Sequence, residues 1–250
     1  MRKIFLVISL VLTQHFSFAQ DLTFFGFIPS YSQTGIISKK FDYNFFASVT
    51  NSALPVTYRG IEYSPKILQT YIQPSIIYKF RPNINFSASV TFNYQRSNPN
   101  AFYFREWRPW QQVIYTHTPF NYKGRLSHRI RFEERFIKNI NDKYRMTTRL
   151  RYQIGYLIPL QGKTLDAKEV YFNTYYELYF SLSNPKSRPR NALHSEDWAY
   201  AGLGYNTNKL GRIEVGFLYQ TNVRDRLKER RNLALLQILW VTNFNPKKKQ

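Results

Sequence analysis

Residues 84–95 read INFSASVTFNYQ, and apolar and polar residues alternate in this stretch without a break. The even-numbered residues are apolar from Ile84 to Tyr94, and the odd-numbered residues are polar from Asn85 to Gln95. Because successive side chains of a β-strand point to opposite faces, the stretch predicts a strand with one apolar and one polar face. A tilted strand that crosses a membrane needs about 9–11 residues, so this strand is long enough to do so.

The same alternation recurs along the chain. It is clear in five further ranges, 67–80, 123–136, 143–158, 168–183 and 211–223, and weaker in four, 37–51, 104–117, 196–207 and 230–244. Together with residues 84–95, these ranges predict ten strands. Residues 227–236 also have the propensity of an amphipathic helix, which is the alternative for the start of the last range.

The predicted fold is all-β, an antiparallel transmembrane β-barrel of about ten strands that occupies residues 35–244. Short turns such as residues 81–83 and 206–210 alternate, imperfectly, with long loops such as 52–66 and 184–195, which is the habit of bacterial outer-membrane barrels. Residues 20–34 contain one more apolar segment. Since single-chain bacterial barrels have even strand numbers, we expect this segment to be a cap, a plug or a partial strand, with twelve strands as the alternative.

A secreted β-sandwich is the competing fold, because it also has one apolar and one polar face. Its strands are commonly about 5–6 residues long, shorter than almost all of the ranges above. Aromatic residues make up 18% of the chain, and Tyr recurs near strand ends, as in the aromatic girdles of membrane barrels. Both features favour the barrel.

The N-terminus has the pattern of an export signal. Met1, Arg2 and Lys3 precede the short apolar run 4–12, and the small residues Ser17 and Ala19 follow. We therefore expect residues 1–19 to be a cleaved signal peptide and the mature protein to reach the outer membrane of a Gram-negative bacterium. An anchor helix is the alternative. At the other end, residues 245–250 form a basic tail.

The formal net charge of +21 invites a nucleic-acid function. Predicted export argues against it, and so does the placement of the charge along strands. The mature chain is long enough for one large domain. It has no cysteine, which excludes thiolate metal ligands and cysteine nucleophiles. No pattern indicates a metal or a cofactor, and we expect a monomer in contact with outer-membrane lipid.

Arginine and glutamate gather on the polar, inward-facing positions of neighbouring strands. The cluster comprises Glu106, Arg108, Arg129, Arg131, Glu133, Arg135, Arg145, Arg149, Arg151, Glu177, Arg212 and Glu214, with Glu169 on the same register. Cross-strand neighbours lie within about 5 Å, so these residues can form ion pairs. One interpretation is structural, because a ten-stranded barrel is narrow and its interior must be filled. The other is a pathway or pocket for small anions, because arginine outnumbers glutamate.

An outer-membrane lipid-acting enzyme is a further alternative, and it would need a histidine beside a serine. His128 falls on the lipid-facing register of its strand, whereas Ser127 points inward, so these two residues cannot face each other. His117 and His194 are the other histidines of the mature chain. No Gly-x-Ser-x-Gly or His-Glu-x-x-His motif is present. We therefore assign no catalytic residue.

Basic residues also fall in the predicted outer loops, where they would be solvated or would bind anionic lipopolysaccharide. They are Arg188, Arg190, Arg224, Arg226, Lys228, Arg230 and Arg231.

Several segments, taken together and in order, resemble a family of uncharacterised bacterial outer-membrane proteins, domain of unknown function 2490. They are residues 106–112 (EWRPWQQ), 129–136 (RIRFEERF), 144–152, 175–180 (YYELYF) and 201–205 (AGLGY). The similarity runs from about residue 36 to the C-terminus. It implies a barrel in the outer membrane and no particular activity. The segment that ends at Phe244 is similar to a terminal aromatic insertion signal, although a basic tail follows it here.

Overall fold

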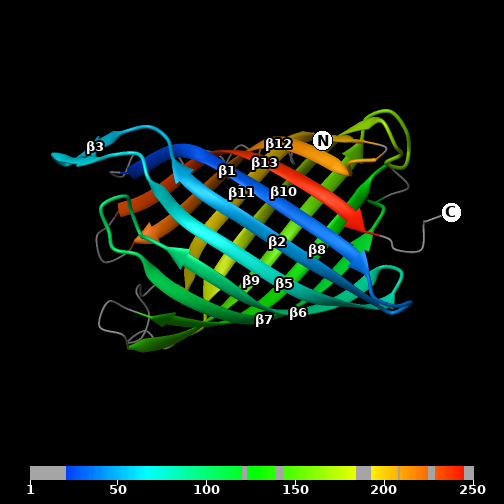
Figure 1. Cartoon of the computed structure of the whole chain (residues 1–250), viewed down its shortest axis with the longest axis horizontal. Coiled ribbons are helices and arrows are strands. Elements are labelled where there is room, and N and C mark those ends of the chain that lie inside the picture. Colours follow the sequence, from blue (N-terminus) through cyan, green and yellow to red (C-terminus); the bar gives the residue numbers. More distant parts are fainter. Residues whose placement is uncertain are drawn as a thin grey trace, which may run out of the picture.

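The strands of the protein close into a barrel. The computed structural model describes residues 21–119, 123–138, 143–183, 193–207, 209–224 and 229–244. In these residues eleven strands form one closed sheet, and two short strands form a separate hairpin (Figure 1). None of the described residues forms a helix of the length and apolarity that a membrane crossing needs.

The wall strands are long, and ten of them match the predicted ranges closely. Their bounds are β2 (Phe41–Ser52), β5 (Ile67–Arg81), β6 (Ile84–Gln95), β7 (Phe104–His117), β8 (Arg125–Lys138), β9 (Tyr144–Pro159), β10 (Glu169–Ser181), β11 (His194–Asn206), β12 (Arg212–Arg224) and β13 (Glu229–Phe244). Successive wall strands from β2 to β13 pair antiparallel, each with its neighbour in the chain. The closed barrel excludes the two-sheet sandwich.

The eleventh strand corrects the prediction for the N-terminal segment. β1 (Asp21–Ile36) is neither a cap nor a plug but a full strand of the wall, antiparallel to β2 and parallel to β13. In Figure 1 it lies between β2 and the red β13. The predicted count of ten is therefore wrong by one strand. Because the closing pair is parallel, Asp21 and Phe244 lie at opposite ends of the barrel.

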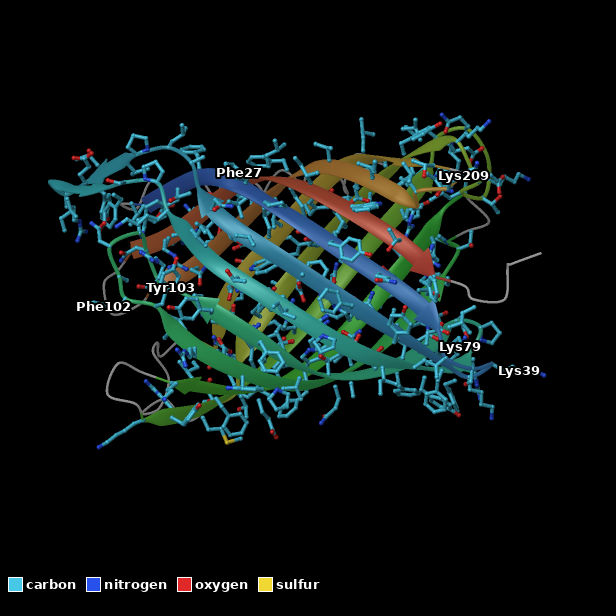
Figure 2. The ribbon with its side chains drawn as sticks, in the orientation of Figure 1. Phe27, Lys39, Lys79, Phe102, Tyr103 and Lys209 are labelled. Carbon is cyan, nitrogen blue, oxygen red and sulfur yellow. The ribbon has the colours of Figure 1, made fainter. Side chains whose placement is uncertain are left out.

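The two ends differ in their connections. The loop end, where β1 and β13 begin, carries residues 53–66 and 96–103, and the turn end carries residues 37–40, 82–83, 160–168 and 207–211. The long loop 53–66 contains the hairpin of β3 (Val56–Tyr58) and β4 (Ile61–Tyr63), which extends beyond the wall in Figure 1. In Figure 2, Phe102 and Tyr103 mark the loop end, and Lys39, Lys79 and Lys209 mark the turn end.

The two faces of the wall follow the alternation of the sequence. On β6, Phe86, Val90 and Phe92 are exposed on the outside, whereas Thr91 and Asn93 are buried on the inside. The same division holds around the barrel, so the outer surface is a wide belt of apolar side chains and the interior is polar over much of its wall.

β13 is a strand from Glu229 onward, so the helix proposed for residues 227–236 does not form in its described part. Arg230 and Arg231 lie in this strand, and Arg224 ends β12, so these three were wrongly placed in loops. The other four basic loop residues, Arg188, Arg190, Arg226 and Lys228, lie outside the described residues, as do the predicted signal peptide and the basic tail.

Candidate functional site

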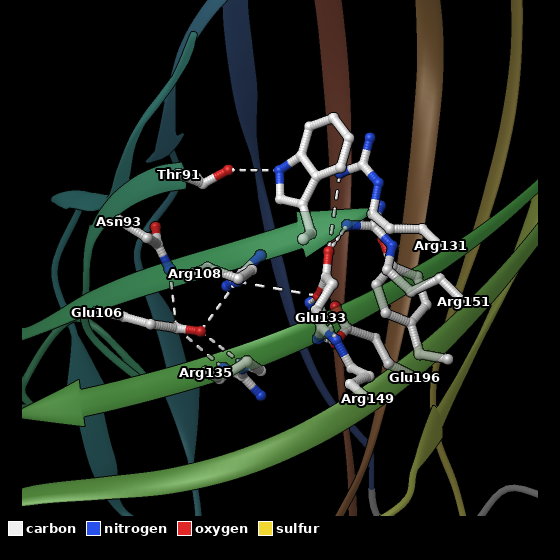
Figure 3. Close-up of polar contacts among 12 residues, drawn as sticks. Thr91, Asn93, Glu106, Arg108, Arg131, Glu133, Arg135, Arg149, Arg151 and Glu196 are labelled. Carbon is white, nitrogen blue, oxygen red and sulfur yellow. Dashed lines mark hydrogen bonds and ion pairs between the residues drawn. The ribbon is translucent and has the colours of Figure 1, made fainter. Parts of the chain in front are cut away.

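Glu133 is the centre of a buried charged network inside the barrel. Its carboxylate accepts hydrogen bonds from Arg149, at 2.6 and 2.9 Å, and from Arg151, at 2.7 Å. Arg131 and Arg108 lie farther from it, at 3.7 and 3.9 Å. Guanidinium groups from three neighbouring strands, β7, β8 and β9, therefore surround one fully buried carboxylate (Figure 3). Such an arrangement keeps the carboxylate and the guanidinium groups hydrogen-bonded where water does not reach them.

Glu106 forms a second centre toward the loop end. Its carboxylate accepts hydrogen bonds from Nε and Nη2 of Arg135, at 2.5 and 3.0 Å, and from Nε of Arg108, at 2.9 Å. Asn93, on the neighbouring β6, donates to it at 3.2 Å (Figure 3). Because Arg108 also lies near Glu133, the two carboxylates belong to one network.

Glu177, on β10, forms a third centre. Arg151 binds it through two hydrogen bonds, at 2.8 and 2.9 Å, and Arg129 donates to it at 2.7 Å. Tyr179 adds a hydrogen bond at 3.1 Å. Glu196, on β11, receives a contact from Arg149 at 3.2 Å and completes the network in the described part of the chain.

Arg131 differs from the other arginines because amide oxygens, and not carboxylates, take its hydrogen bonds. Gln112 accepts from it at 2.6 and 2.8 Å and Gln73 at 3.2 Å. Its guanidinium lies 3.9 Å from the centre of the Trp110 ring, which gives a cation–π contact. The side chain is 5% exposed, and among the described residues only Glu133, 3.7 Å away, is a carboxylate within ion-pair distance.

The network carries a surplus of positive charge. Within the described residues it joins six arginines, Arg108, Arg129, Arg131, Arg135, Arg149 and Arg151, to four glutamates, Glu106, Glu133, Glu177 and Glu196. Its formal charge is therefore +2. All six arginines also border a lumen cavity of about 920 Å³, and the Nε of Arg129 is buried with no hydrogen-bond partner.

A smaller cavity, of about 220 Å³, lies toward the turn end. Arg125 and Arg212 line it, and neither forms an ion pair with a described residue. Among the described residues that line it, Glu214 carries the one carboxylate. This carboxylate accepts hydrogen bonds from Asn173, at 3.1 and 3.2 Å, and from the Tyr200 hydroxyl, at 2.7 Å.

Tyr200 contacts one lining residue of each cavity. It donates to Glu214, on the wall of the small cavity, and its ring stacks at 5.0 Å on Tyr175, on the wall of the large one. Glycine makes room for this ring, because a Cβ at Gly202 would lie 2.2 Å and one at Gly216 2.5 Å from the Tyr200 hydroxyl. Small residues on β11 and β12 thus allow a tyrosine to lie flat inside the wall.

One family profile matches the chain, that of "Protein of unknown function (DUF2490)", over residues 37–230. The chain belongs to this family. No curated protein and no solved structure matches it significantly. In this DUF2490 barrel the matched range begins just before β2, so it leaves out β1 and most of β13, the parallel pair that closes the wall.

The structure of this DUF2490 member brings most of the predicted charged residues together but not all of them. Arg145 borders the large cavity near the loop end and forms no ion pair with a described residue. Arg212 and Glu214 lie apart from the network, at the small cavity. Glu169 accepts a hydrogen bond from the Asp166 backbone in the turn 160–168. Sequence analysis missed Glu196, because it stands at the first position of a weakly patterned range.

The histidine and serine geometry follows the expected registers. Ser127 bonds the Gly155 carbonyl inside the wall, at 3.2 Å, whereas His128 bonds the Tyr152 hydroxyl at 2.8 Å. His128 also stacks on His117, with 5.6 Å between ring centres. His117 and His128 thus pair with each other and not with Ser127. Among the described residues no group of three or more histidine or acidic side chains has the arrangement of a metal site.

Proposed function

We propose that the protein is an outer-membrane β-barrel whose lumen binds small anions. The membrane part of the proposal rests on the outer face of the wall, where large apolar side chains on strand after strand are exposed, among them Phe27, Ile76, Ile130, Phe217 and Ile238. A continuous belt of this kind needs a covering, since soluble monomers rarely expose apolar patches of more than a few hundred Å². Strands of this length suit a bilayer.

The environment of Arg131 is the observation that supports anion binding in the lumen. Burying a guanidinium is costly unless an opposite charge offsets it. Arg131 has only amide acceptors within hydrogen-bond distance, and its network has two more cations than anions beside a 920 Å³ cavity. An anion in that cavity would balance the charge.

Passage through the barrel is a second candidate, favoured by the arginines of the small cavity. Arg125 and Arg212 place positive charge at the small cavity, and neither forms an ion pair with a described residue. Conductance of the refolded protein in a planar bilayer tests passage. Anion-selective steps that shrink when Arg131 and Arg149 are replaced support it, and a silent bilayer leaves binding without passage.

The test of binding is calorimetric titration of the folded protein in nanodiscs with inorganic phosphate and pyrophosphate. Arg131→Gln removes the charge and keeps a polar side chain, although a shorter one. Since a hydrogen bond to a charged group contributes about 1.5–3 kcal/mol, we expect affinity to fall about tenfold or more. Arg105→Gln is the matched control, because Arg105 is an exposed arginine outside the lumen cavities on the same strand as Arg108.

The proposal fails if the parent protein takes up neither anion, or if Arg131→Gln binds them as well as Arg105→Gln does. In that case the arginines and glutamates fill the lumen as packing, which is the structural interpretation of the cluster.

A further inference from the structure

The two sides of the large cavity differ in chemistry. Its charged side is formed by β7, β8 and β9, which carry Arg108, Arg131 and Arg149 among others. In the order of strands around the barrel, β1, β12 and β13 lie across from these three. Their contribution to the cavity wall combines the apolar Ile28, Leu218, Leu233 and Leu239 with the polar Gln220, Asn222, Arg231 and Gln237, and Leu68 of β5 lines the cavity as well. The arginine side thus faces a side of mixed chemistry, and we call its apolar part, Ile28, Leu218, Leu233 and Leu239, the aliphatic wall.

The aliphatic wall is unusual for its place. The interior of a membrane barrel is ordinarily polar, because it is filled with water or with paired polar groups. Here an apolar cluster of buried residues runs along the inside of β1, β12 and β13 and continues to Tyr63 of the hairpin, whose ring lies 5.5 Å from that of Phe24. Packing under the hairpin explains the loop-end part of the cluster. It does not explain why Ile28, Leu218 and Leu233 also border open space.

We infer that the ligand of the lumen is an amphipathic anion, a hydrocarbon chain that ends in a phosphate or carboxylate. The inference rests on the proposed anion binding and adds the substrate class. The head would lie against Arg131 and Arg129, and the chain along the wall of β1, β12 and β13. A cavity of about 920 Å³ is in the usual range for binding sites, about 300–1,000 Å³, which are mostly apolar with a few placed polar groups.

Ile28, Leu218 and Leu233 are already buried and Leu239 is half-buried, so a small anion alone would leave in contact with water the apolar surface that still faces the cavity. Burying apolar surface is favourable by about 25 cal/mol per Å², so a ligand whose alkyl chain covers this remaining surface binds more tightly than its head group alone. Inorganic phosphate is therefore a fragment of the expected ligand, and the alkyl chain should strengthen binding with each added methylene.

The four tryptophans provide a readout of where the chain lies. Trp110 lies against Arg131, and Trp198 lines the large cavity, whereas Trp107 and Trp240 are exposed on the outer surface. Replacing Trp107 and Trp240 with Phe leaves only the two inner reporters. A brominated alkyl chain of the ligand quenches the fluorescence of these two tryptophans on contact, and an alkyl chain that remains outside the wall does not.

The experiment titrates this Trp107→Phe, Trp240→Phe protein, in nanodiscs of unbrominated lipid, with decyl phosphate brominated on its chain. Inorganic phosphate and unbrominated decyl phosphate are titrated by calorimetry. We expect decyl phosphate to bind at least about tenfold more tightly than phosphate, since each buried methylene adds about 0.8 kcal/mol. We also expect its brominated form to quench the inner tryptophans. A separate arm uses nanodiscs of brominated phospholipid, in which quenching identifies a bilayer lipid as the source and its absence identifies a free amphiphile.

A pair of variants on one strand tests the aliphatic wall. Leu233→Ala shortens a side chain that borders the cavity, and Leu236→Ala makes the same change on the outer face of β13. We expect Leu233→Ala to lower the affinity for decyl phosphate about fivefold and to leave the affinity for phosphate unchanged. Leu236→Ala should change neither affinity.

The outcomes separate this inference from the proposed function. If phosphate binds through Arg131 but decyl phosphate binds no more tightly and does not quench, the amphipathic ligand is wrong and anion binding stands. If neither ligand binds, both fail. If decyl phosphate quenches but binds equally well to the Arg131→Gln variant, the head does not lie at the arginines and both are overturned.

Discussion

Replacing Glu133 with Gln should be among the most destabilising single changes in the barrel. The carboxylate accepts three hydrogen bonds from Arg149 and Arg151, and it lies within 3.9 Å of Arg108 and Arg131. A glutamine keeps the volume but removes the charge, so the formal charge of the network rises from +2 to +3. Four arginines then lie around a neutral amide.

The cost follows from the burial of the partners. Removing one member of a buried ion pair costs about 3–5 kcal/mol, because the other charge stays buried without compensation. Glu133 and its two hydrogen-bonded arginines are all nearly inaccessible to water, so we expect a loss of about 3–5 kcal/mol in the free energy of unfolding. Urea unfolding in lipid vesicles, followed by tryptophan fluorescence, measures it if folding and unfolding branches coincide.

Glu134→Gln is the matched control. Glu134 is the next residue, it points to the opposite face of β8, and it has no ion pair among the described residues. We expect its stability to change by about 0.5 kcal/mol or less, as is usual for substitutions away from buried networks. A Glu133→Gln protein as stable as this control would refute the reasoning, because the network would then gain nothing from its central carboxylate.

Three further predictions concern the wall and its placement. Gly204→Val should destabilise the barrel by about 1–3 kcal/mol, because a Cβ there would lie 2.1 Å from the Tyr171 ring, and Tyr171→Ala should restore part of the loss in the double variant. The chain has no native cysteine, so single cysteines can report which end of the barrel faces outward. Thr57→Cys at the loop end should react with an impermeant maleimide on intact cells, and Asn83→Cys at the turn end should not. The reverse pattern would show that the barrel has the opposite orientation in the membrane. Ile76→Arg, at an outer position 57% exposed in the middle of β5, should cost about 2–4 kcal/mol in bilayers, and a negligible cost would contradict a lipid-facing belt.

Ten wall strands were predictable because their two faces differ in polarity. β1 was not recognised as a wall strand because its first half is apolar on both faces, with Leu22 and Phe24 inside and Phe25 and Phe27 outside. Its pairing is also invisible in the sequence, since β13 lies about two hundred residues away and a parallel closure breaks the rule of even strand numbers.

The site was predictable to the level of register. Alternation placed Arg131 and Glu133 inside, and cross-strand neighbours could be paired. The contact from Arg131 to Gln73 could not be predicted, because it joins β8 to β5, past two intervening strands and through the interior. The environment of Arg131 depends on contacts of this kind, which cannot be deduced from the pairing of adjacent strands.

The most direct test of the central claim, that the arginine wall of the lumen binds an anion, is anomalous diffraction from crystals soaked in bromide. Bromide scatters distinctly and needs no specific chemistry beyond positive charge and hydrogen-bond donors. We expect a peak within hydrogen-bond distance of the Arg131 or Arg129 guanidinium, and its loss in the Arg131→Gln protein. A lumen with no bromide beside either guanidinium, or the same peak in that variant, would contradict it.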